Sequence, residues 1–369
     1  MRRIEPVSKE ALDSLGAIWG NFALEGELSR AERLYQGHLH STYIGVRKIA
    51  GSSREVRYIH QRINTTAFER TEWMLENTAK IASFIKSHPE NTFPASLSVV
   101  ETKSGEPYLL GNGEFWRSYE FVEDSISYDI CPNVEKAFQL GRATGEFLFL
   151  LKDFPVAELQ DHSPGFQDTV VRWEQLEHAL ATADSERREI GEPVVREFAS
   201  MLEQTSRVSA ALSAGSIPQQ IVHGDTKINN FLFRENSDEV LCLVDIDLCM
   251  KGSVLYDIGD LIRSASAVGR EDEPNLEKVG VDNATVLAIV KGFLESRLTL
   301  TTRERELLPD AGCTISFNLS TRFLADFLAG DRYFPVLHPQ HNLERALAQW
   351  KVTKGLFDSR ALIVPLVDG

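Results

Sequence analysis

The chain has 369 residues, 43% of them hydrophobic and 25% charged, which is long enough for two packed domains and excludes a disordered or fibrous protein. A formal net charge of −15 argues against attachment to nucleic acid or to an anionic membrane, because both need a positive field. No apolar segment approaches the ~18 residues of a membrane span. The four cysteines are scattered along the chain, which is typical of reduced thiols in a cytosolic protein. We therefore expect a cytoplasmic enzyme without nucleic-acid or membrane partners.

The first third of the chain predicts a small sheet with accompanying helices. A helix is expected near residues 8–24, and the segment 34–63 alternates polar and apolar residues as two antiparallel strands do. An amphipathic helix follows over 71–86. The pair Asn112-Gly113 lies between two aromatic-rich runs and predicts a hairpin, because both turn positions require positive φ.

Beyond residue 134 the pattern changes to long helices, interrupted by one β-like stretch at 219–260. The chain is therefore predicted to be α+β, with a nucleotide-binding lobe over residues 1–122 and a mainly helical lobe over 123–369. The predicted helices of the second lobe span 134–152, 168–184, 186–213, 283–308, 316–329 and 341–357.

Acidic and amide side chains gather in the β-like stretch, at Asp225, Asn230 and Asp245. If its two later strands pair as a hairpin, these three side chains converge. Such a set suits phosphoryl transfer, in which one carboxylate accepts the proton of an acceptor hydroxyl and another carboxylate with an amide oxygen holds Mg²⁺. The ammonium of Lys227 can then contact the transferring phosphoryl group. Asp247 is a second metal ligand if a loop, rather than a strand, follows Asp245.

The segments "HGDTKINN", "LVDID" and "YDIGDLIR" resemble the catalytic and metal-binding loops of the aminoglycoside and choline kinase superfamily. Further stretches resemble the bacterial N-acetylhexosamine 1-kinases and are spread over most of the chain: "YIHQRINTTAFE", "WRSYEFVEDSISYD", "GRATGEFLFLLKDFP", "PGFQDTVVRW", "TRFLADFLAGDRYF" and "HNLERALAQW". The resemblance implies a bilobal protein-kinase-like fold, and transfer of the ATP γ-phosphate to the anomeric hydroxyl of N-acetylglucosamine or N-acetylgalactosamine.

Carried over position by position, the resemblance assigns roles to several residues. Asp225 is the expected general base, Asn230 and Asp245 are the expected magnesium ligands, and Arg322 and Tyr333 are expected to bind the sugar. His223 and Asp257 are expected to support the catalytic loop rather than react. Two positions depart from the family: Gly224 stands where these sugar kinases usually have asparagine, and Lys251 where they usually have proline.

The nucleotide side is less clearly marked. Gly37 is a candidate for a turn over the phosphates, although no G-x-G-x-x-G or Walker sequence surrounds it. Protein kinases clamp the phosphates with a strand lysine, and Gln61 and Arg62 occupy the corresponding strand. Neighbours in a strand face opposite ways, so only one of the two can point at ATP. Glu120 and Val122 lie in a segment whose backbone could bind adenine.

Two other functions remain open from the sequence. The first is a kinase of another small hydroxyl compound, such as another hexose, an amino alcohol or an aminoglycoside. The acidic chain would attract the polycationic aminoglycoside. The second is a pseudokinase, which the presence of Asp225 and both metal ligands disfavours. The oligomeric state is left open.

Overall fold

The structure, a computed structural model, describes residues 3–35, 40–66 and 70–367. Its contacts divide the chain into two compact units, Met1–Ser125 and Ile126–Gly369, and each is described separately below. The N-terminal part is rich in strands and the larger C-terminal part is mainly helical, so the predicted α+β class is confirmed. None of the helices formed by the described residues combines the length and apolar character that a membrane crossing requires.

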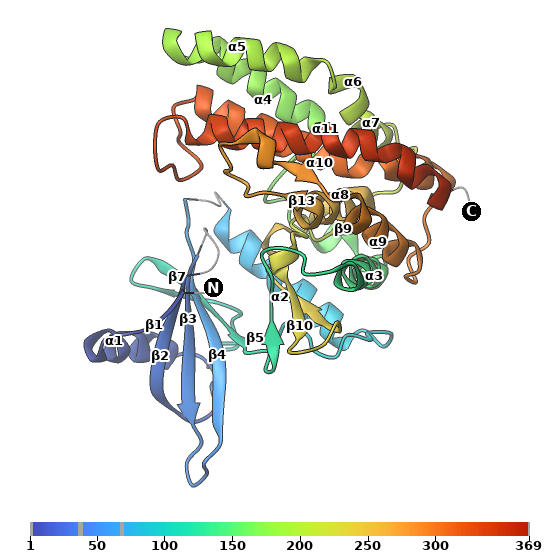
Figure 1. Ribbon diagram of the computed structural model, residues 1–369. Coiled ribbons are helices and arrows are strands. Elements are labelled where there is room, and N and C mark those ends of the chain that lie inside the picture. Colours follow the sequence, from blue (N-terminus) through green and yellow to red (C-terminus); the bar gives the residue numbers. More distant parts are fainter. Residues whose placement is uncertain (1–2, 36–39, 67–69, 368–369) are drawn as a thin grey trace. The chain divides into compact units, whose positions relative to one another are not determined.

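The described residues of the first unit form a seven-stranded antiparallel sheet of order β1-β2-β3-β4-β7-β5, in which β6 also pairs with β7 (Figure 1). The elements are β1 (Arg3–Pro6), α1 (Lys9–Trp19), β2 (Glu27–Tyr35), β3 (Ser41–Lys48), β4 (Glu55–Arg62), α2 (Thr71–Ser87), β5 (Val99–Val100), β6 (Leu109–Gly111) and β7 (Glu114–Glu120). Most of β2 was not predicted, because only one of its nine residues is buried and its hydrophobic alternation is weak. The predicted hairpin is present, with φ of 55° at Asn112 and 77° at Gly113.

The sheet of the first unit has a helix against each face. Trp19 of α1 packs with Tyr58 of β4 and Trp116 of β7 in one buried cluster. The next residue along β7, Arg117, points to the other face, where its Nη1 lies 3.7 Å from the sulfur of Met74 in α2. The strand alternation therefore separates an aromatic face, covered by α1, from a second face with Arg117, covered by α2.

A fully buried histidine lies in the aromatic core. The His60 ring stacks on Trp19 at a centroid distance of 3.9 Å, and its Nδ1 lies 2.7 Å from Ser118 Oγ. Burial, reinforced by the positive charge of Arg47, lowers the pKa of His60 to about 3. Between pH ~6.5 and pH ~3 the folded unit therefore holds this ring neutral, whereas the unfolded chain would protonate it.

We expect the stability of the first unit to fall as the pH drops below the ordinary histidine pKa of ~6.5. Below that pH the unfolded chain binds a proton that folded His60 does not. The free energy of unfolding is therefore unaffected by this histidine above pH ~6.5 and decreases progressively from there to pH ~3. From pH 7 to pH 5 the loss is about 2 kcal/mol for a pKa of about 3. Denaturant unfolding at the two pH values measures it. In His60→Phe, which keeps the stacking but cannot titrate, the difference between pH 7 and pH 5 should shrink by that amount; an unchanged difference would assign the acid sensitivity to other groups.

The second unit consists mainly of helices, with short strands near its centre. Strand β8 (Ser125–Ile126) spans the boundary of the two units. The elements that follow are α3 (Val134–Leu151), α4 (Thr169–Thr182), α5 (Ser185–Ala199), α6 (Leu202–Thr205), α7 (Arg207–Ser213), β9 (Gln220–Val222), β10 (Phe231–Arg234), β11 (Val240–Leu243), β12 (Met250–Gly252), α8 (Val254–Ser266), β13 (Ala267–Val268), β14 (Gly280–Val281), α9 (Asn283–Leu294), α10 (Thr302–Leu328) and α11 (His341–Val367).

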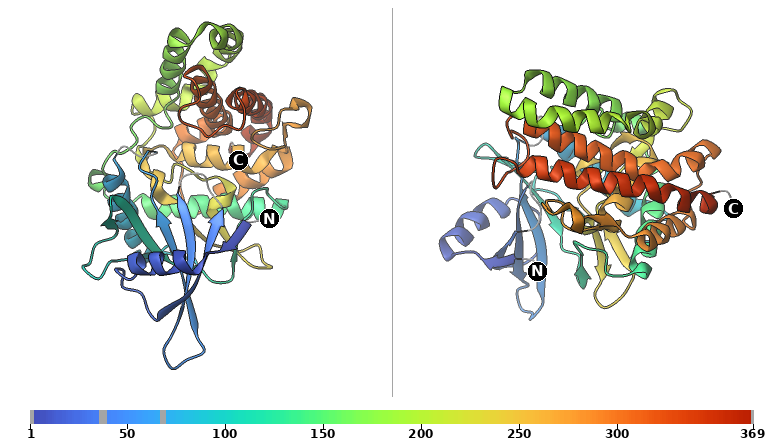
Figure 2. Two further views of the ribbon diagram at one scale, coloured as in Figure 1. Left: turned by 90° about the vertical axis from the view of Figure 1, so that its left-hand side faces the viewer. Right: turned by 45° about the horizontal axis from the view of Figure 1, so that its top comes forward.

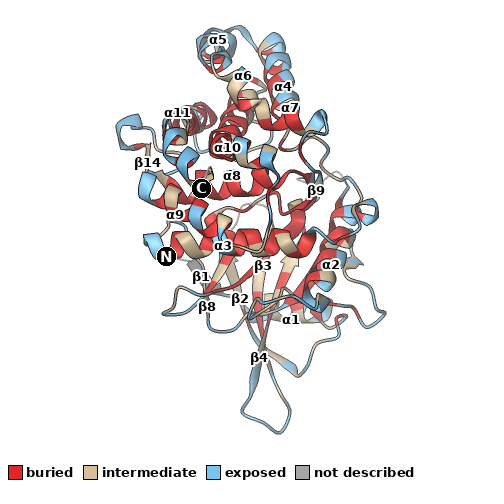
Figure 3. Ribbon diagram, turned by 90° about the vertical axis from the view of Figure 1, so that its right-hand side faces the viewer, coloured by how far each residue is buried: buried red, intermediate tan, exposed pale blue. Residues whose placement is uncertain are grey.

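Helix α10 is the centre of the second unit and contacts α11, α8 and α4. Helices α10 and α11 run side by side, and α4 and α5 lie on their far side from α8 (Figure 2). The core between them contains Trp173, Phe198, Phe317, Phe327 and Trp350. Helices α8 and α10 are buried along most of their length (Figure 3). The long helices thus form a rigid support for the loops between them.

Several helix predictions were wrong in their boundaries: α1 ends at Trp19 rather than near residue 24, and α11 continues to Val367 rather than to residue 357. The segment 283–308 is not one helix, because α9 ends at Leu294 and α10 begins after Thr301, whose side chain and that of Glu304 form a reciprocal capping box. Helix α10 then runs through Pro309, where a break was predicted. Packing against three other helices outweighs the ~3 kcal/mol that a proline costs inside a helix.

The predicted helix 186–213 is likewise divided into α5, α6 and α7. The break after Ala199 lies at Ser200, whose Oγ donates to the carbonyl of Glu197 at 2.6 Å. Serine side chains compete in this way for backbone acceptors, and they favour helix ends.

Candidate active site

The centre of the site is a loop of the second unit that connects β9 to β10. Strands β10 and β11 form the predicted hairpin, with Phe231 opposite Leu243. At its open end the Val244 amide donates to the carbonyl of Asn230 at 2.9 Å. Asn230 accepts this backbone hydrogen bond, and Asp245 directly follows its donor, Val244. The hairpin thus brings together residues that are 15 positions apart in the sequence.

Asp225 is bound from two sides within this loop. Lys227 Nζ donates to Asp225 Oδ2 at 2.6 Å, and Asn230 Nδ2 donates to the same oxygen at 3.1 Å and to the Asp225 carbonyl at 2.8 Å. The Asp225 side chain keeps 19% of its surface exposed, so a small molecule can reach it. The three side chains thus form a fixed cluster around one accessible carboxylate.

The charges of this cluster stabilise each other's ionised forms. Burial alone would raise the pKa of Asp225, but the ammonium of Lys227 and its hydrogen bond outweigh burial, and the pKa is lowered. Burial alone would lower the pKa of Lys227, but the carboxylates of Asp225 and Asp245 raise it above its usual value. At neutral pH the structure therefore presents an ionised carboxylate beside a protonated amine.

Asp257 of α8 holds the backbone of the same loop. Its two carboxylate oxygens accept hydrogen bonds from the amides of His223 and Gly224, at 2.7 and 2.8 Å. Burial raises the pKa of Asp257 to about 6, although His223 and the two amides favour the charged form. His223 is fully buried, with Nε2 3.0 Å from the Val244 carbonyl oxygen. Neither side chain is placed to react, and both are placed to position the loop.

The glycine that departs from the sugar-kinase pattern is required by the local backbone. Gly224 has φ of +80°, and a Cβ there would lie 2.4 Å from both the Leu248 carbonyl oxygen and Met250 Cε. The second departure, Lys251, lies in β12, where it is exposed and pairs with Ile221 of β9. Strand β12 was not predicted, and it anchors the chain that follows Asp247.

The strand before the predicted metal ligands ends at Leu243, so Asp245 and Asp247 lie in a turn. Asp245 adopts the left-handed conformation, with φ 63° and ψ 52°, which aspartate tolerates better than most residues, and a single 3-10 turn follows. Burial raises the pKa of the Cys249 thiol well above its usual value, and so do the charges of Asp257, Asp247 and Asp245. Asp245 and Asp247 therefore both lie near this thiol, and no strand alternation turns them apart.

The donor atoms present fit a hard cation. The Nδ2 of Asn230 faces Asp225, so its amide oxygen is directed away from that carboxylate. This oxygen and the carboxylates of Asp245 and Asp247 are the oxygen donors that Mg²⁺ prefers. Within residues 3–35, 40–66 and 70–367, no group of three or more His, Cys, Asp or Glu side chains is arranged to hold a metal. A magnesium ion at this position would therefore depend on the asparagine and on phosphate or water oxygens.

Arg322 and Tyr333 lie together in the same unit. Arg322 Cζ lies 5.8 Å from the centre of the Tyr333 ring. Asp326, one turn after Arg322, accepts hydrogen bonds from the amides of Arg332, Tyr333 and Phe334, each at 2.9 Å. This carboxylate fixes the loop that carries Tyr333.

A segment before α4 connects these residues with the catalytic loop. Gln167 Nε2 donates to the Gly224 carbonyl at 3.2 Å, and Asn318 of α10 donates to the Gln167 carbonyl at 2.7 Å. The neighbouring ring of Phe166 lies under the guanidinium of Arg322, at 4.4 Å. The segment "PGFQDTVVRW" resembles the sugar kinases, but no site residue was predicted within it. The signal in the sequence was Arg172, an arginine among apolar residues four positions after the helix-capping Asp168.

On the nucleotide side, the structure separates Gln61 from Arg62. Arg62 is exposed and pairs with Glu114 at 3.0 Å. Gln61 accepts a hydrogen bond from Arg117 Nε at 2.9 Å and shares with it the sheet face that is turned to α2. In protein kinases the strand lysine is on the face that the helix covers, so Gln61 occupies the comparable position and Arg62 does not.

Some backbone groups of the other residues predicted to bind the nucleotide already form hydrogen bonds within the protein. The amide of Glu120 donates to the Ser98 carbonyl at 3.0 Å, and the Val122 carbonyl accepts a hydrogen bond from Ser125 Oγ at 2.6 Å. Gly37 lies outside the described residues. These backbone groups of Glu120 and Val122 already have partners within the first unit.

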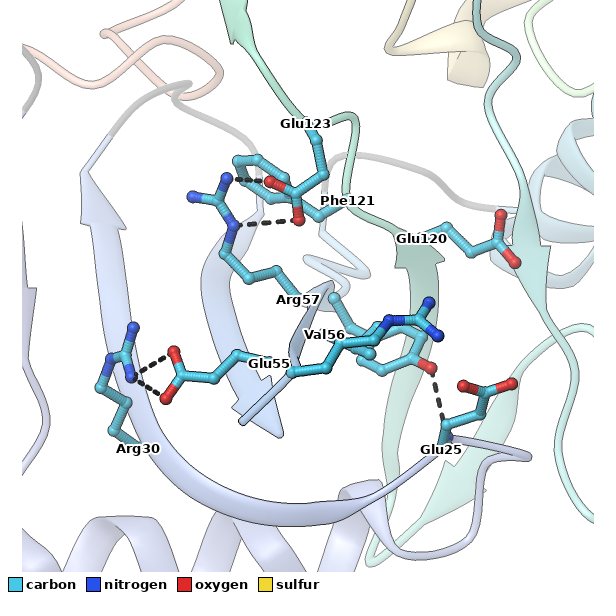
Figure 4. Close-up of a pocket in the computed structure, with 10 residues that line it drawn as sticks. Glu25, Arg30, Glu55, Val56, Arg57, Glu120, Phe121 and Glu123 are labelled. Atoms are coloured by element: carbon cyan, nitrogen blue, oxygen red, sulfur yellow. Dashed lines mark hydrogen bonds and ion pairs between the residues drawn. The ribbon is translucent and has the colours of Figure 1, made fainter. Parts of the chain in front are cut away.

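A pocket of about 630 Å³ lies in the first unit (Figure 4). Its charged residues include ion pairs between Arg57 and Glu123 and between Arg30 and Glu55. The lining residues are Glu25, Arg30, Arg54, Glu55, Val56, Arg57, Tyr58, Glu120, Phe121 and Glu123. Carboxylates outnumber guanidiniums in this set, so the field of the pocket does not favour a triphosphate.

Solved structures of low sequence identity share the fold. An aminopropanol kinase associated with a microcompartment aligns with a TM-score of 0.61 and 15% identity over 95% of this chain and 98% of that one. An amicoumacin kinase in complex with AMP-PNP and Ca²⁺ gives 0.60 and 15% over 96% and 97%. An aminoglycoside phosphotransferase from Alicyclobacillus acidocaldarius gives 0.56 and 16% over 98% and 96%.

The family assignment comes from the sequence match. A model described as the phosphotransferase enzyme family, APH, matches residues 52–285 of the chain. This segment contains the Asp225 cluster, Asp245 and Asp257, and it makes up more than half of the protein. The chain therefore belongs to the APH phosphotransferase enzyme family.

Proposed function

We propose that this phosphotransferase is an ATP- and Mg²⁺-dependent kinase that phosphorylates the anomeric hydroxyl of an N-acetylhexosamine. The proposed acceptors are N-acetylglucosamine and N-acetylgalactosamine, and the products are the sugar 1-phosphate and ADP. The chain-wide resemblance to the N-acetylhexosamine 1-kinases supports this acceptor. The family match and the kinase fold support the reaction type.

One observation in particular carries the proposal. Arg322, whose guanidinium carbon lies 5.8 Å from the centre of the Tyr333 ring, is close enough to Asp225 for the carboxylate to raise its pKa, although burial keeps the net pKa below the usual value. A donor of several hydrogen bonds therefore lies within electrostatic range of an ionised carboxylate with an accessible surface. Sugar hydroxyls need such donors and acceptors, and the base must lie within hydrogen-bond reach of the reacting hydroxyl.

The chemistry assigned to these residues is a single phosphoryl transfer. Asp225 accepts the proton of the anomeric O–H as the new O–P bond forms, and the bond between the γ-phosphorus and the β,γ-bridging oxygen breaks, releasing ADP. Lys227 keeps Asp225 ionised and offers its ammonium to the negative charge that develops on the phosphoryl oxygens. Asn230, Asp245 and Asp247 would hold Mg²⁺, which neutralises phosphate charge when bound.

A kinase of another small hydroxyl compound is the second candidate. The names of two fold neighbours, the aminopropanol kinase and the aminoglycoside phosphotransferase, favour it, as does the net charge of −15, which would attract a cationic acceptor. In this case the same Asp225 cluster would act on a different hydroxyl.

Product analysis tests the proposal. The purified protein is incubated with ATP, Mg²⁺ and a panel of N-acetylglucosamine, N-acetylgalactosamine, glucose, galactose, an amino alcohol and an aminoglycoside. The expected result is ADP release with the N-acetylhexosamines and a phosphorus NMR signal coupled to the anomeric proton. Turnover confined to the amino alcohol or the aminoglycoside would establish the second candidate, and phosphorylation at a ring hydroxyl would refute the anomeric position.

A further inference from the structure

Two arginines of the second unit lie beside each other around one aromatic ring. Arg172 of α4 and Arg322 of α10 have their guanidinium carbons 5.1 and 4.4 Å from the centre of the Phe166 ring. Each residue is partly buried, so each remains accessible to a ligand. The Phe166 ring attracts both guanidiniums by cation–π interaction, but this attraction is weaker than a charge-assisted hydrogen bond to a carboxylate.

Neither arginine has a carboxylate within ion-pair distance among the described parts of the chain. Arg172 donates instead to two neutral oxygens, the Phe166 carbonyl at 2.8 Å and Gln175 Oε1 at 2.7 Å. The guanidinium carbon of Arg322 lies near two further rings, 5.8 Å from that of Tyr333 and 5.4 Å from that of Phe334. Several other arginines of the unit that are similarly enclosed have an acidic partner, as in Arg263–Asp260 at 2.7 Å and Arg187–Asp331 at 2.7 Å.

The two guanidiniums oppose each other electrostatically. Burial and the charge of Arg322 lower the pKa of Arg172 to about 9, although Tyr333 and Asp168 favour the charged form. Burial also lowers the pKa of Arg322. Holding two like charges together in a partly desolvated place costs free energy. A ligand that brings negative charge would remove this cost.

The pair is adjacent to the catalytic loop through contacts already described. Phe166 precedes Gln167, whose side chain donates to the Gly224 carbonyl, and Gly224 precedes the candidate base Asp225. From the other side, Asn318 of α10 donates to the Gln167 carbonyl, one turn before Arg322. A ligand with a hydroxyl at Asp225 can therefore present another of its groups to the two arginines.

We propose that Arg172 and Arg322 form an anion subsite of the acceptor pocket, and that the preferred acceptor is a hexose or N-acetylhexosamine derivative that carries a carboxylate or phosphate. The guanidinium fork matches the oxygens of either group and forms charge-assisted hydrogen bonds with them. The inference rests on the proposed function for the position of the reacting hydroxyl. Neutral sugars remain acceptors but weaker ones, and cationic acceptors are repelled.

Matched pairs of acceptors test the proposal with the intact enzyme. Glucose is compared with glucuronic acid, and N-acetylglucosamine with its 6-phosphate, by coupled ADP release. In at least one of the two pairs the anionic member is expected to have kcat/KM at least ~10-fold above its neutral partner, as charge-assisted hydrogen bonds predict. Neutral members that equal or exceed both anionic members in the wild-type enzyme would overturn the proposal, whatever any variant does.

Variants assign the preference to the arginine pair. In Arg172→Met the preference should fall to less than ~3-fold, and in Arg172→Lys, which keeps the charge but loses the fork, to an intermediate value. Arg196→Met is the matched control, because Arg196 is exposed on the neighbouring helix α5 and pairs with Glu192 within its own helix. A preference that survives Arg172→Met intact would place the anion elsewhere.

A binding measurement separates this inference from the proposed function. Calorimetric titration with glucuronate and with glucose, without ATP, reports on the subsite even if no sugar is phosphorylated. Glucuronate that binds more tightly than glucose, with a dependence on Arg172, would support the subsite while the absence of turnover refutes the sugar kinase. If the pair instead holds the transferred phosphoryl group, Arg172→Met should reduce turnover of neutral and anionic acceptors equally and weaken inhibition by the sugar 1-phosphate, which would refute the proposal.

Discussion

Replacing Asp225 by asparagine is expected to reduce kcat at least ~100-fold, because the amide cannot accept the proton of the acceptor hydroxyl. The side chain keeps its size, and Asn230 can still donate to the carbonyl of residue 225. Binding of Mg-ATP should therefore change little. Steady-state assays with saturating ATP and acceptor measure kcat, and calorimetric titration with a non-hydrolysable nucleotide measures binding.

The matched control for this substitution is Asp358→Asn, at an exposed position of α11. It should leave both quantities unchanged. Turnover of Asp225→Asn at the wild-type rate would remove Asp225 from the role of base. A parallel loss of nucleotide affinity would show instead that the carboxylate acts mainly on the metal–nucleotide complex.

Replacing Asp257 by alanine is the substitution expected to combine the largest losses of stability and activity. It leaves the buried amides of His223 and Gly224 without an acceptor, and hydrogen bonds to a charged group contribute about 1.5–3 kcal/mol each. The relief of burying a carboxylate offsets part of this, so we expect a net loss of about 3 kcal/mol in the free energy of unfolding. Activity should fall because the backbone next to Asp225 is no longer held.

Denaturant unfolding followed by circular dichroism measures the stability of this variant, and hydrogen–deuterium exchange of peptides covering residues 222–226 reports on the loop. Exchange should accelerate in these peptides and remain unchanged in α11. Asp358→Ala again serves as the control. If Asp257→Ala kept wild-type exchange in the loop, the carboxylate would not be what fixes its backbone.

Local patterns in the sequence were sufficient for elements whose stability is itself local. The turn at Asn112-Gly113 needs two positive φ angles, and these residues adopt them at low cost. Helices α2, α3 and α4 end within two residues of their predicted limits, because each carries a regular apolar stripe. The predicted convergence of Asp225, Asn230 and Asp245 required only one further assumption, that β10 and β11 pair.

Long-range packing decided the features that the sequence left open or misplaced. Helix α10 runs through Pro309 because three neighbouring helices bury it, and no local rule contains those neighbours. Most of β2 was missed because its strand character comes from pairing with β1 and β3 rather than from its own apolar residues. The same holds for β12, which is defined by its pairing with β9.

By itself the sequence was sufficient to predict a phosphotransferase, since the residue types suited to accepting a proton, binding a cation and neutralising a phosphate lie within one short stretch and its hairpin. The tertiary structure alone decided what surrounds that stretch. It placed both oxygens of Asp257 on the loop amides and brought Arg172 and Arg322 to the same ring, that of Phe166. The physical reason is that electrostatic and hydrogen-bond energies depend on distances in space, and residues 150 positions apart acquire such distances only when the helices pack.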